Sequence, residues 1–159
     1  MVKQWKLKSG CSVGLVLSGP ANAYLIQAGN TCYLVDTGRS NALERLQAGM
    51  DEMKGSRKLS TLILTHTHYD HCQNAAAIQA TEKCRIIASA HAKNSMRNGY
   101  TQLPSGTNFF TDLFVRMGRR TGWQRFRYEP FQADILINEE LNIDASETKI
   151  RIIETPGHS

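Results

Sequence analysis

Four side chains of the kinds that bind metal ions crowd into one short stretch of the chain. The sequence "THTHYDH", residues 65–71, contains His66, His68, Asp70 and His71. It directly follows "LSTLIL", a continuous apolar run typical of a strand buried on both faces. In an extended turn alternate side chains point the same way, so the first three ligands can converge, and the start of a helix can turn His71 inward as well. The pattern predicts a metal site beyond the carboxyl end of a buried strand, where α/β proteins usually place their sites.

The donor types indicate which metal such a site would hold. Imidazole nitrogens and carboxylate oxygens suit Zn²⁺, and they suit iron or manganese less selectively. Three protein ligands leave a position open for water in a catalytic zinc site, whereas four give a closed structural site. Four candidates here, with a further histidine elsewhere, leave room for one or two ions. A carboxylate beside a metal-bound water can also orient that water or take up its proton, so Asp70 is a candidate catalytic residue.

Apolar periodicity predicts the elements that position this stretch. Residues 40–54 repeat apolar side chains every three or four positions, which predicts an amphipathic helix capped by Ser40 or Asn41 and closed by Gly55. Further helices are expected at 71–83, which is rich in alanine, at 90–99 and at 109–120. Strands are expected at 11–18, 22–29, 31–38, 59–65, 84–89, 135–137, 141–143 and 150–153, with a hairpin turn at Gly29–Asn30. This alternation predicts an α/β architecture with a sheet covered by helices.

Three motifs in this order resemble those of the metallo-β-lactamase-fold hydrolases: "LVDTG" at 34–38, "THTHYDH" at 65–71 and "TPGHS" at 155–159. The resemblance runs through essentially the whole chain and is greatest to the glyoxalase II-like branch of hydrolases and thioesterases. It implies an α/β fold, a four-layer αββα sandwich with the metal site at one edge between the two sheets. We therefore expect residues 1–159 to form one such domain, incomplete at its C-terminal end, supplying mainly the N-terminal αβ half.

The resemblance also assigns roles to individual residues. Its metal ligands are His66, His68 and His158 for the first ion, and Asp70 and His71 for the second. Asp36 would lie just below the site and position ligands through hydrogen bonds. The aspartate that bridges both ions in this family, and the last histidine of the second ion, have no match here, because His91 lies upstream in an expected helix. The "CQN" sequence at 72–74 also lacks the glycines that many relatives carry after this motif.

Two consequences follow from the absent ligands. The first ion has a full three-histidine set, so an open site for a single zinc ion is chemically reasonable, while the second ion has too few ligands to be held tightly. Half of a sandwich also leaves sheet surface uncovered. We expect a poorly stable chain, a homodimer that covers this surface, or a longer protein of which the chain is the N-terminal part, and we favour the last.

The resemblance implies a metal-dependent hydrolase that uses a metal-activated water on an ester, thioester, lactone or similar bond. Two other functions stay open: a mononuclear iron dioxygenase or non-hydrolytic metal-binding sensor of the same fold, and a nucleic-acid-processing member of the superfamily. The identity of the metal separates the first from a hydrolase, and a steep salt dependence of nucleic acid binding would support the second. The chain has no Gly-rich phosphate loop, which disfavours nucleotide-driven chemistry.

Arginines and aromatic residues are interleaved between positions 116 and 128. A solvated helix and turn is the favoured interpretation of this segment. The alternative is an anion-binding lip, in which Arg119 and Arg120 contact an anionic substrate. We expect a small-molecule substrate rather than nucleic acid as the partner.

Composition places the chain among ordinary globular domains, with 41% apolar and 21% charged residues and a net charge of +5. No apolar run approaches the roughly 20 residues that span a bilayer, and the N-terminus lacks the apolar stretch of a signal peptide. We therefore expect no membrane partner and a cytoplasmic location. The four cysteines form no CxxC pair, which favours free thiols.

Overall fold

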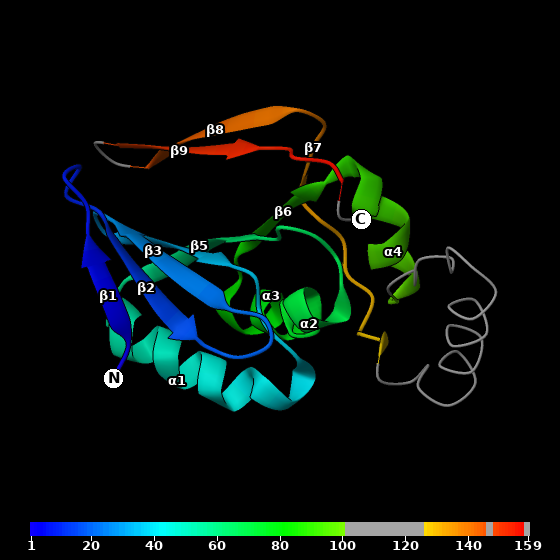
Figure 1. Cartoon of the computed structure of the whole chain (residues 1–159), viewed down its shortest axis with the longest axis horizontal. Helices are drawn as coiled ribbons and strands as arrows, with labels where there is room; N and C mark the ends of the chain where they lie inside the picture. The colour runs from blue at the N-terminus through cyan, green and yellow to red at the C-terminus, as the bar shows by residue number, and fades with distance from the viewer. Residues whose placement is uncertain (101–125, 146–147, 158–159) are drawn as a thin grey trace.

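Seven strands form one mixed sheet in the computed structural model, which describes residues 1–100, 126–145 and 148–157 (Figure 1). The strands lie side by side in chain order, so every strand pairs with its sequence neighbours. The first four pair antiparallel: β1 (Lys3–Lys6), β2 (Ser12–Leu17), β3 (Ala23–Ala28) and β4 (Thr31–Val35). From β4 onward the pairing is parallel, through β5 (Lys58–Ile63), β6 (Arg85–Ser89) and β7 (Ile135–Ile137). The carboxyl ends of β4 and β5 therefore meet at one edge of the sheet.

Helices cover one face of the sheet and a β-hairpin covers the other (Figure 1). The helical elements are η1 (Ser40–Ala42), α1 (Leu43–Lys54), α2 (Tyr69–Cys72), α3 (Ala75–Glu82), η2 (Ala90–Ala92) and α4 (Lys93–Asn98). The hairpin consists of β8 (Glu140–Ala145) and β9 (Thr148–Ile153). The described residues thus form helix, sheet and sheet layers of the expected αββα sandwich. None of the helices in the described residues is long and apolar enough to cross a membrane.

Two apolar clusters hold these layers together. The larger lies between the sheet and the helices, and it includes Leu34 and Leu62 of the sheet with Leu46 and Ile78 of α1 and α3, all four fully buried. The smaller lies between the sheet and the hairpin. Its members are Cys11, Ala28, Tyr33, Ile63 and Ala145, with Ile26, Val35, Ile143, Ile150 and Ile152 packed against them. Both faces of the central strands are therefore covered, as expected for a continuous apolar strand such as β5.

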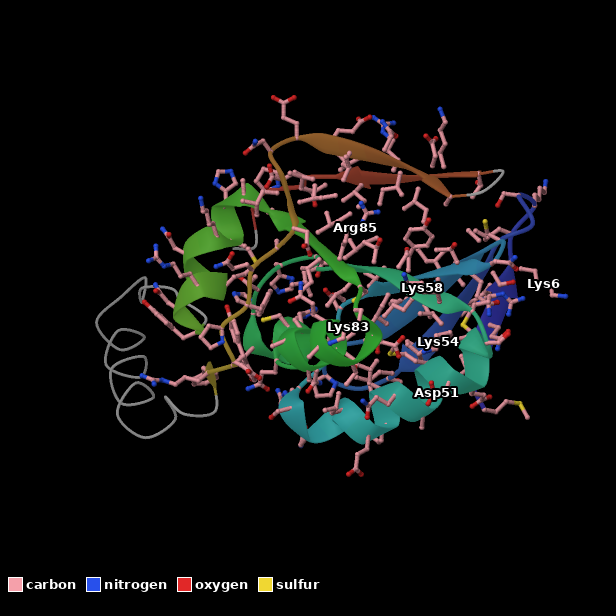
Figure 2. The ribbon with its side chains drawn as sticks, turned by 180° about the vertical axis from the view of Figure 1, so that it is seen from behind. Lys6, Asp51, Lys54, Lys58, Lys83 and Arg85 are labelled. Carbon is pink, nitrogen blue, oxygen red and sulfur yellow. The ribbon has the colours of Figure 1, made fainter. Side chains whose placement is uncertain are left out.

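Basic side chains gather at the sheet edge opposite to the carboxyl ends of β4 and β5. Lys58 opens β5 and Arg85 opens β6, while Lys54 ends α1 and Lys83 follows α3, as Figure 2 shows from behind. Lys54 forms an ion pair with Glu82 at 2.7 Å. Cations near helix carboxyl ends are favourable because the helix dipole is negative there. The positions of Lys54 and Lys83 at helix carboxyl ends are therefore electrostatically favourable.

The predicted helix at 40–54 and its closure at Gly55 are confirmed, but its predicted cap is wrong. The residue before α1 is Ala42, which makes no side-chain capping bond, because Ser40–Ala42 form a 3₁₀ turn that leads straight into the helix. The predicted hairpin turn at Gly29–Asn30 joins β3 to β4. Its residue Gly29 has φ of +58°, which glycine adopts without strain. The helix expected at 109–120 lies outside the described residues.

The predicted helix at 71–83 is divided into two, with α2 ending at Cys72 and α3 beginning at Ala75. Asn74 lies at the break, and its side-chain amide donates to the carbonyl oxygens of Thr37 and Arg39, both at 2.8 Å. These bonds tie the break to the loop after β4. Asparagine favours such bonds over a helix interior because its short amide reaches nearby backbone groups.

Candidate metal centre

The histidines of the "THTHYDH" motif lie where β5 ends. The backbone leaves β5 at Ile63, bends at Thr65, and enters α2 at Tyr69 after His68, which is extended. The neighbouring strand β4 ends in the same direction, and Asp36 follows it. The amide of Asp36 donates to the carbonyl oxygen of Ile63 at 3.0 Å, so the two loops leave the sheet side by side.

Three imidazole rings come together at this edge. The ring centres of His66 and His68 are 4.6 Å apart with the planes nearly perpendicular, and those of His66 and His71 are 4.1 Å apart. Asp70 lies in the single turn of α2 and is partly exposed. The structure therefore brings the three histidines of the motif into one cluster, with Asp70 adjacent in sequence to His71.

Asp36 anchors this cluster from below. Its side chain is only 4% exposed, and its Oδ1 accepts the backbone N–H of Thr65 at 2.9 Å. Its Oδ2 accepts the Thr65 hydroxyl at 2.7 Å and lies 2.8 Å from Nδ1 of His71. Asp36 also has a φ of +59°, a left-handed conformation that costs free energy for a residue with a side chain. The surrounding hydrogen bonds hold the carboxylate in this conformation.

The Asp36 carboxylate fixes which ring nitrogen carries the proton in two histidines. A carboxylate only accepts hydrogen bonds, so Nδ1 of His71 must be the protonated nitrogen, which leaves the lone pair on Nε2. The Thr65 hydroxyl donates its one hydrogen to Asp36. It must therefore accept a hydrogen bond from Nδ1 of His66, which lies 3.0 Å away. His66 therefore also carries its lone pair on Nε2. A carboxylate that orients ligand histidines in this way is a regular feature of metal sites.

The same contact changes the acidity of His71. The hydrogen bond that His71 donates to Asp36 raises the pKa of the imidazole, the charges of Asp36 and Asp70 act in the same direction, and partial burial opposes them. The pKa of His71 is raised on balance. Negative charge close to the rings favours a bound cation as well as a bound proton.

The donor chemistry fits a zinc ion, although the described residues alone do not form a complete cage. Within residues 1–100, 126–145 and 148–157, no group of three His, Cys, Asp or Glu side chains is arranged to hold a metal. His158, the third histidine of the expected first site, lies outside the described residues, as do Arg119 and Arg120. The fixed Nε2 lone pairs of His66 and His71 are the neutral imidazole donors that zinc prefers. His91 is exposed on η2 and is not one of the predicted metal ligands.

Thr37 and Asn74 also contribute to the site, and the sequence motifs did not single them out. The amide and hydroxyl of Thr37 both donate to the carbonyl oxygen of His71, at 2.7 and 3.0 Å. The backbone N–H of Asn74 in turn donates to the Thr37 hydroxyl at 3.2 Å. Both side chains are almost completely buried. The sequence held one signal for Asn74, namely that Gln73 and Asn74 stand where many relatives have glycines after the motif.

Cys72 lies next to the histidines in sequence but belongs to the core. Its side chain is fully buried in the cluster between sheet and helices. Burial raises the pKa of the Cys72 thiol well above its ordinary value, so the thiolate that would bind a metal is disfavoured. The thiol packs as an apolar side chain.

Comparisons with known proteins agree with this fold and site. The family model of the metallo-beta-lactamase superfamily matches residues 17–159, and the chain belongs to that superfamily. The predicted membership and the predicted fold are confirmed, while the glyoxalase II-like branch stays a prediction. No curated protein sequence matches the chain closely enough to support a comparison.

Similar solved structures include three metallo-β-lactamases. BJP-1, a subclass B3 metallo-β-lactamase of Bradyrhizobium japonicum, has a TM-score of 0.73 at 18% identity. The match covers 98% of this chain and 53% of the BJP-1 chain. MIM-1 from Novosphingobium pentaromativorans has a TM-score of 0.72 at 17% identity, and the match covers 92% of this chain and 49% of MIM-1. GOB-18 from Elizabethkingia meningoseptica has a TM-score of 0.69 at 17% identity, and the match covers 92% of this chain and 49% of GOB-18. At these identities the likeness establishes the fold alone, and the chain spans about half the length of the structures it matches.

Proposed function

We propose that this chain supplies the metal-binding part of a metal-dependent hydrolase that cleaves an ester, thioester, lactone or similar bond. The observation that carries the proposal is the Asp36 carboxylate, which sets the protonated nitrogen of both His66 and His71. A surface loop with chance histidines has no need of a buried carboxylate in a strained conformation beneath it. The superfamily membership of the chain supports the same activity.

Each residue of the site has a proposed role. The proposed zinc ligands are His66, His68 and His158 for the first ion, with Asp70 and His71 contributing to a second. When bound, zinc lowers the pKa of a coordinated water towards neutrality and polarises the oxygen of the scissile group. Asp70, partly exposed at the start of α2, orients the attacking water or takes up its proton. Arg119 and Arg120 are proposed contacts for an anionic substrate.

A substrate panel with and without metal tests this function. We expect the zinc-loaded chain to hydrolyse at least one of p-nitrophenyl acetate, a thioester and a lactone, and chelation to abolish this turnover. Asp70→Asn should lower kcat by roughly 10²- to 10⁴-fold, the usual contribution of a positioned acid or base. Asp51→Asn is the matched control, because its carboxylate lies on the exposed side of α1 with 72% of the side chain accessible.

Two results would change the proposal. Turnover that survives chelation would remove metal-dependent hydrolysis as the function. A marked preference for a β-lactam over the other substrates would keep the mechanism and replace the substrate class.

A further inference from the structure

Arg39 contacts the "THTHYDH" motif through Tyr69. It follows Asp36 by three residues in the loop after β4, and its Nη2 donates to the hydroxyl of Tyr69 at 3.1 Å. Its guanidinium carbon is also 5.2 Å from the centre of the Tyr69 ring, within range of a cation–π contact. Tyr69 stands in the motif between His68 and Asp70. The guanidinium therefore contacts a residue that is flanked on both sides by candidate metal ligands.

The two residues after Cys72 hold the backbone of Arg39 in place. Asn74 donates its side-chain amide to the carbonyl oxygen of Arg39 at 2.8 Å. Gln73 accepts the backbone N–H of the next residue, Ser40, at 3.1 Å. Both the C=O and the N–H of the Arg39–Ser40 peptide group are thus engaged by neighbours in the break between α2 and α3.

The other side of Tyr69 is fixed as well. Its ring packs edge to face against Phe126, with ring centres 4.8 Å apart. Gln73 also donates its side-chain amide to the carbonyl oxygen of Arg127 at 2.7 Å. One glutamine side chain therefore joins the segment of Arg39 to the segment of Phe126, with Tyr69 packed between the two. The result is a preorganised cluster of Arg39, Tyr69 and Phe126, built around the residue that follows His68 in the motif.

The charge of Arg39 has no counterpart in the described part of the chain. No carboxylate there forms an ion pair with its guanidinium, and its Nε is buried with no hydrogen-bond partner among those residues. A guanidinium offers five N–H donors, and one of them is engaged by Tyr69. A partly buried cation without a negative partner is costly, and a bound anion would offset that cost.

We propose that Arg39 is a specificity-determining residue that binds a carboxylate group of the substrate. This inference rests on the proposed hydrolase function and adds a substrate class to it, namely acyl compounds that carry a carboxylate. One guanidinium matches the single charge of a carboxylate, and its planar fork suits both oxygens. Tyr69, Gln73 and Asn74 act as positioning residues, because they hold Arg39 and touch no substrate in this scheme.

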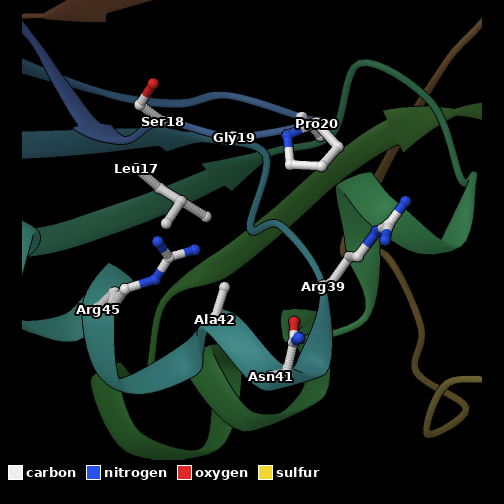
Figure 3. Close-up of a pocket in the computed structure, with 9 residues that line it drawn as sticks. Leu17, Ser18, Gly19, Pro20, Arg39, Asn41, Ala42 and Arg45 are labelled. Carbon is white, nitrogen blue, oxygen red and sulfur yellow. The ribbon is translucent and has the colours of Figure 1, made fainter.

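Arg45 is a natural control for Arg39. Both residues line a cavity of about 30 Å³ between the loop after β2 and the start of α1. A space of that size admits about one or two water molecules and no substrate. Figure 3 shows Arg39 extending away from Ala42 and Arg45, in keeping with its bond to Tyr69. Arg45 is exposed and carries the same charge, so it tests general charge effects.

The experiment compares two esters that differ in one charge, p-nitrophenyl acetate and the p-nitrophenyl monoester of succinic acid. For zinc-loaded wild type, the kcat/KM ratio of the charged to the neutral ester should exceed that of Arg39→Ala by about tenfold or more, mainly through KM, because bonds to charged groups contribute at this level. Arg39→Lys should restore part of the ratio, and Arg45→Ala should leave it as in wild type. An unchanged ratio in Arg39→Ala would overturn the proposal.

Binding of succinate separates failure of this inference from failure of the proposed function. Calorimetric titration with succinate, with and without one equivalent of zinc, should give a binding signal that Arg39→Ala loses and Arg45→Ala keeps. If neither these esters nor the thioester and lactone of the substrate panel are hydrolysed, the hydrolase proposal fails, and this titration still decides the role of Arg39. Wild type that binds no succinate, or binds it as well as a folded Arg39→Ala variant, would overturn the inference.

Discussion

Asp36 makes the hydrogen bonds that organise the candidate metal centre. Its two oxygens accept hydrogen bonds from Thr65 and from Nδ1 of His71, and through the Thr65 hydroxyl its influence reaches His66. The carboxylate thereby determines where two imidazole rings carry their lone pairs. Its left-handed backbone is tolerated because the neighbouring groups hold it from several sides.

Replacing Asp36 with asparagine tests this role. Asparagine tolerates the left-handed backbone, but its amide presents a donor where the second carboxylate oxygen accepts. Nδ1 of His71 would then accept, which moves the proton to Nε2 and removes the lone pair that would bind metal. We expect zinc affinity, measured by competition with a chelating dye, to fall about 10- to 100-fold. Glu44→Gln, at an exposed carboxylate of α1, should leave it unchanged, and equal affinities in both variants would contradict this role.

The sequence predicted the ligand types more readily than the groups that support them. The spacing of His66, His68 and His71 directly after an apolar strand was sufficient to predict that their rings come together at this sheet edge. The link from Asp36 through Thr65 to His66 was not predictable, because it depends on two loops leaving neighbouring parallel strands together. The bonds of Asn74 were missed for the same reason, since its partners lie more than 30 positions away in the chain.

At the scale of elements, the contact between α1 and β2 shows how tightly the helical layer approaches the sheet. A Cβ atom on Gly49 of α1 would lie 2.2 Å from the carbonyl oxygen of Val16 in β2. The carbonyl oxygen is a backbone atom, and the backbone of α1 fixes the position of the Cβ atom. Neither atom can therefore rotate away from the other. The glycine in the buried face of α1 therefore permits the close approach of helix and sheet.

Gly49→Ala should destabilise the chain by about 1–3 kcal/mol, although alanine is the better helix former. The matched control is Ala48→Gly, at the exposed position one residue earlier, where glycine should cost about 0.5–1 kcal/mol through backbone entropy alone. Urea denaturation of both variants measures these changes. A Gly49→Ala variant as stable as wild type would mean that the helix does not approach the sheet this closely.

Periodicity predicted most of the elements and failed where side chains bind the backbone. The apolar spacing of Leu46, Met50 and Met53 places α1 correctly, because these side chains fill the core. The cap and the break after Cys72 were not predictable from the same pattern. In the structure Ser40 N–H is engaged by the side chain of Gln73, a tertiary contact that no local pattern contains.

On the scale of the whole molecule, the hairpin of β8 and β9 begins the second sheet of a sandwich. Its inner residues Ile143, Ile150 and Ile152 pack on the first sheet but are only partly buried, and Ile153 on its outer side is 52% exposed. The chain spans about half the length of the structures it matches. A homodimer that covers this surface stays a prediction, and analytical ultracentrifugation of the chain would test it.

The most direct test of the account is the zinc content of purified protein with a verified intact mass. We predict at least one tightly bound zinc ion per chain in wild type, measured by elemental analysis, and its loss in His66→Ala that remains folded by circular dichroism. Iron in place of zinc would favour the dioxygenase alternative. Zinc-free wild type after incubation with the metal, or equal zinc in wild type and His66→Ala, would contradict the claim that this sheet edge is a metal centre.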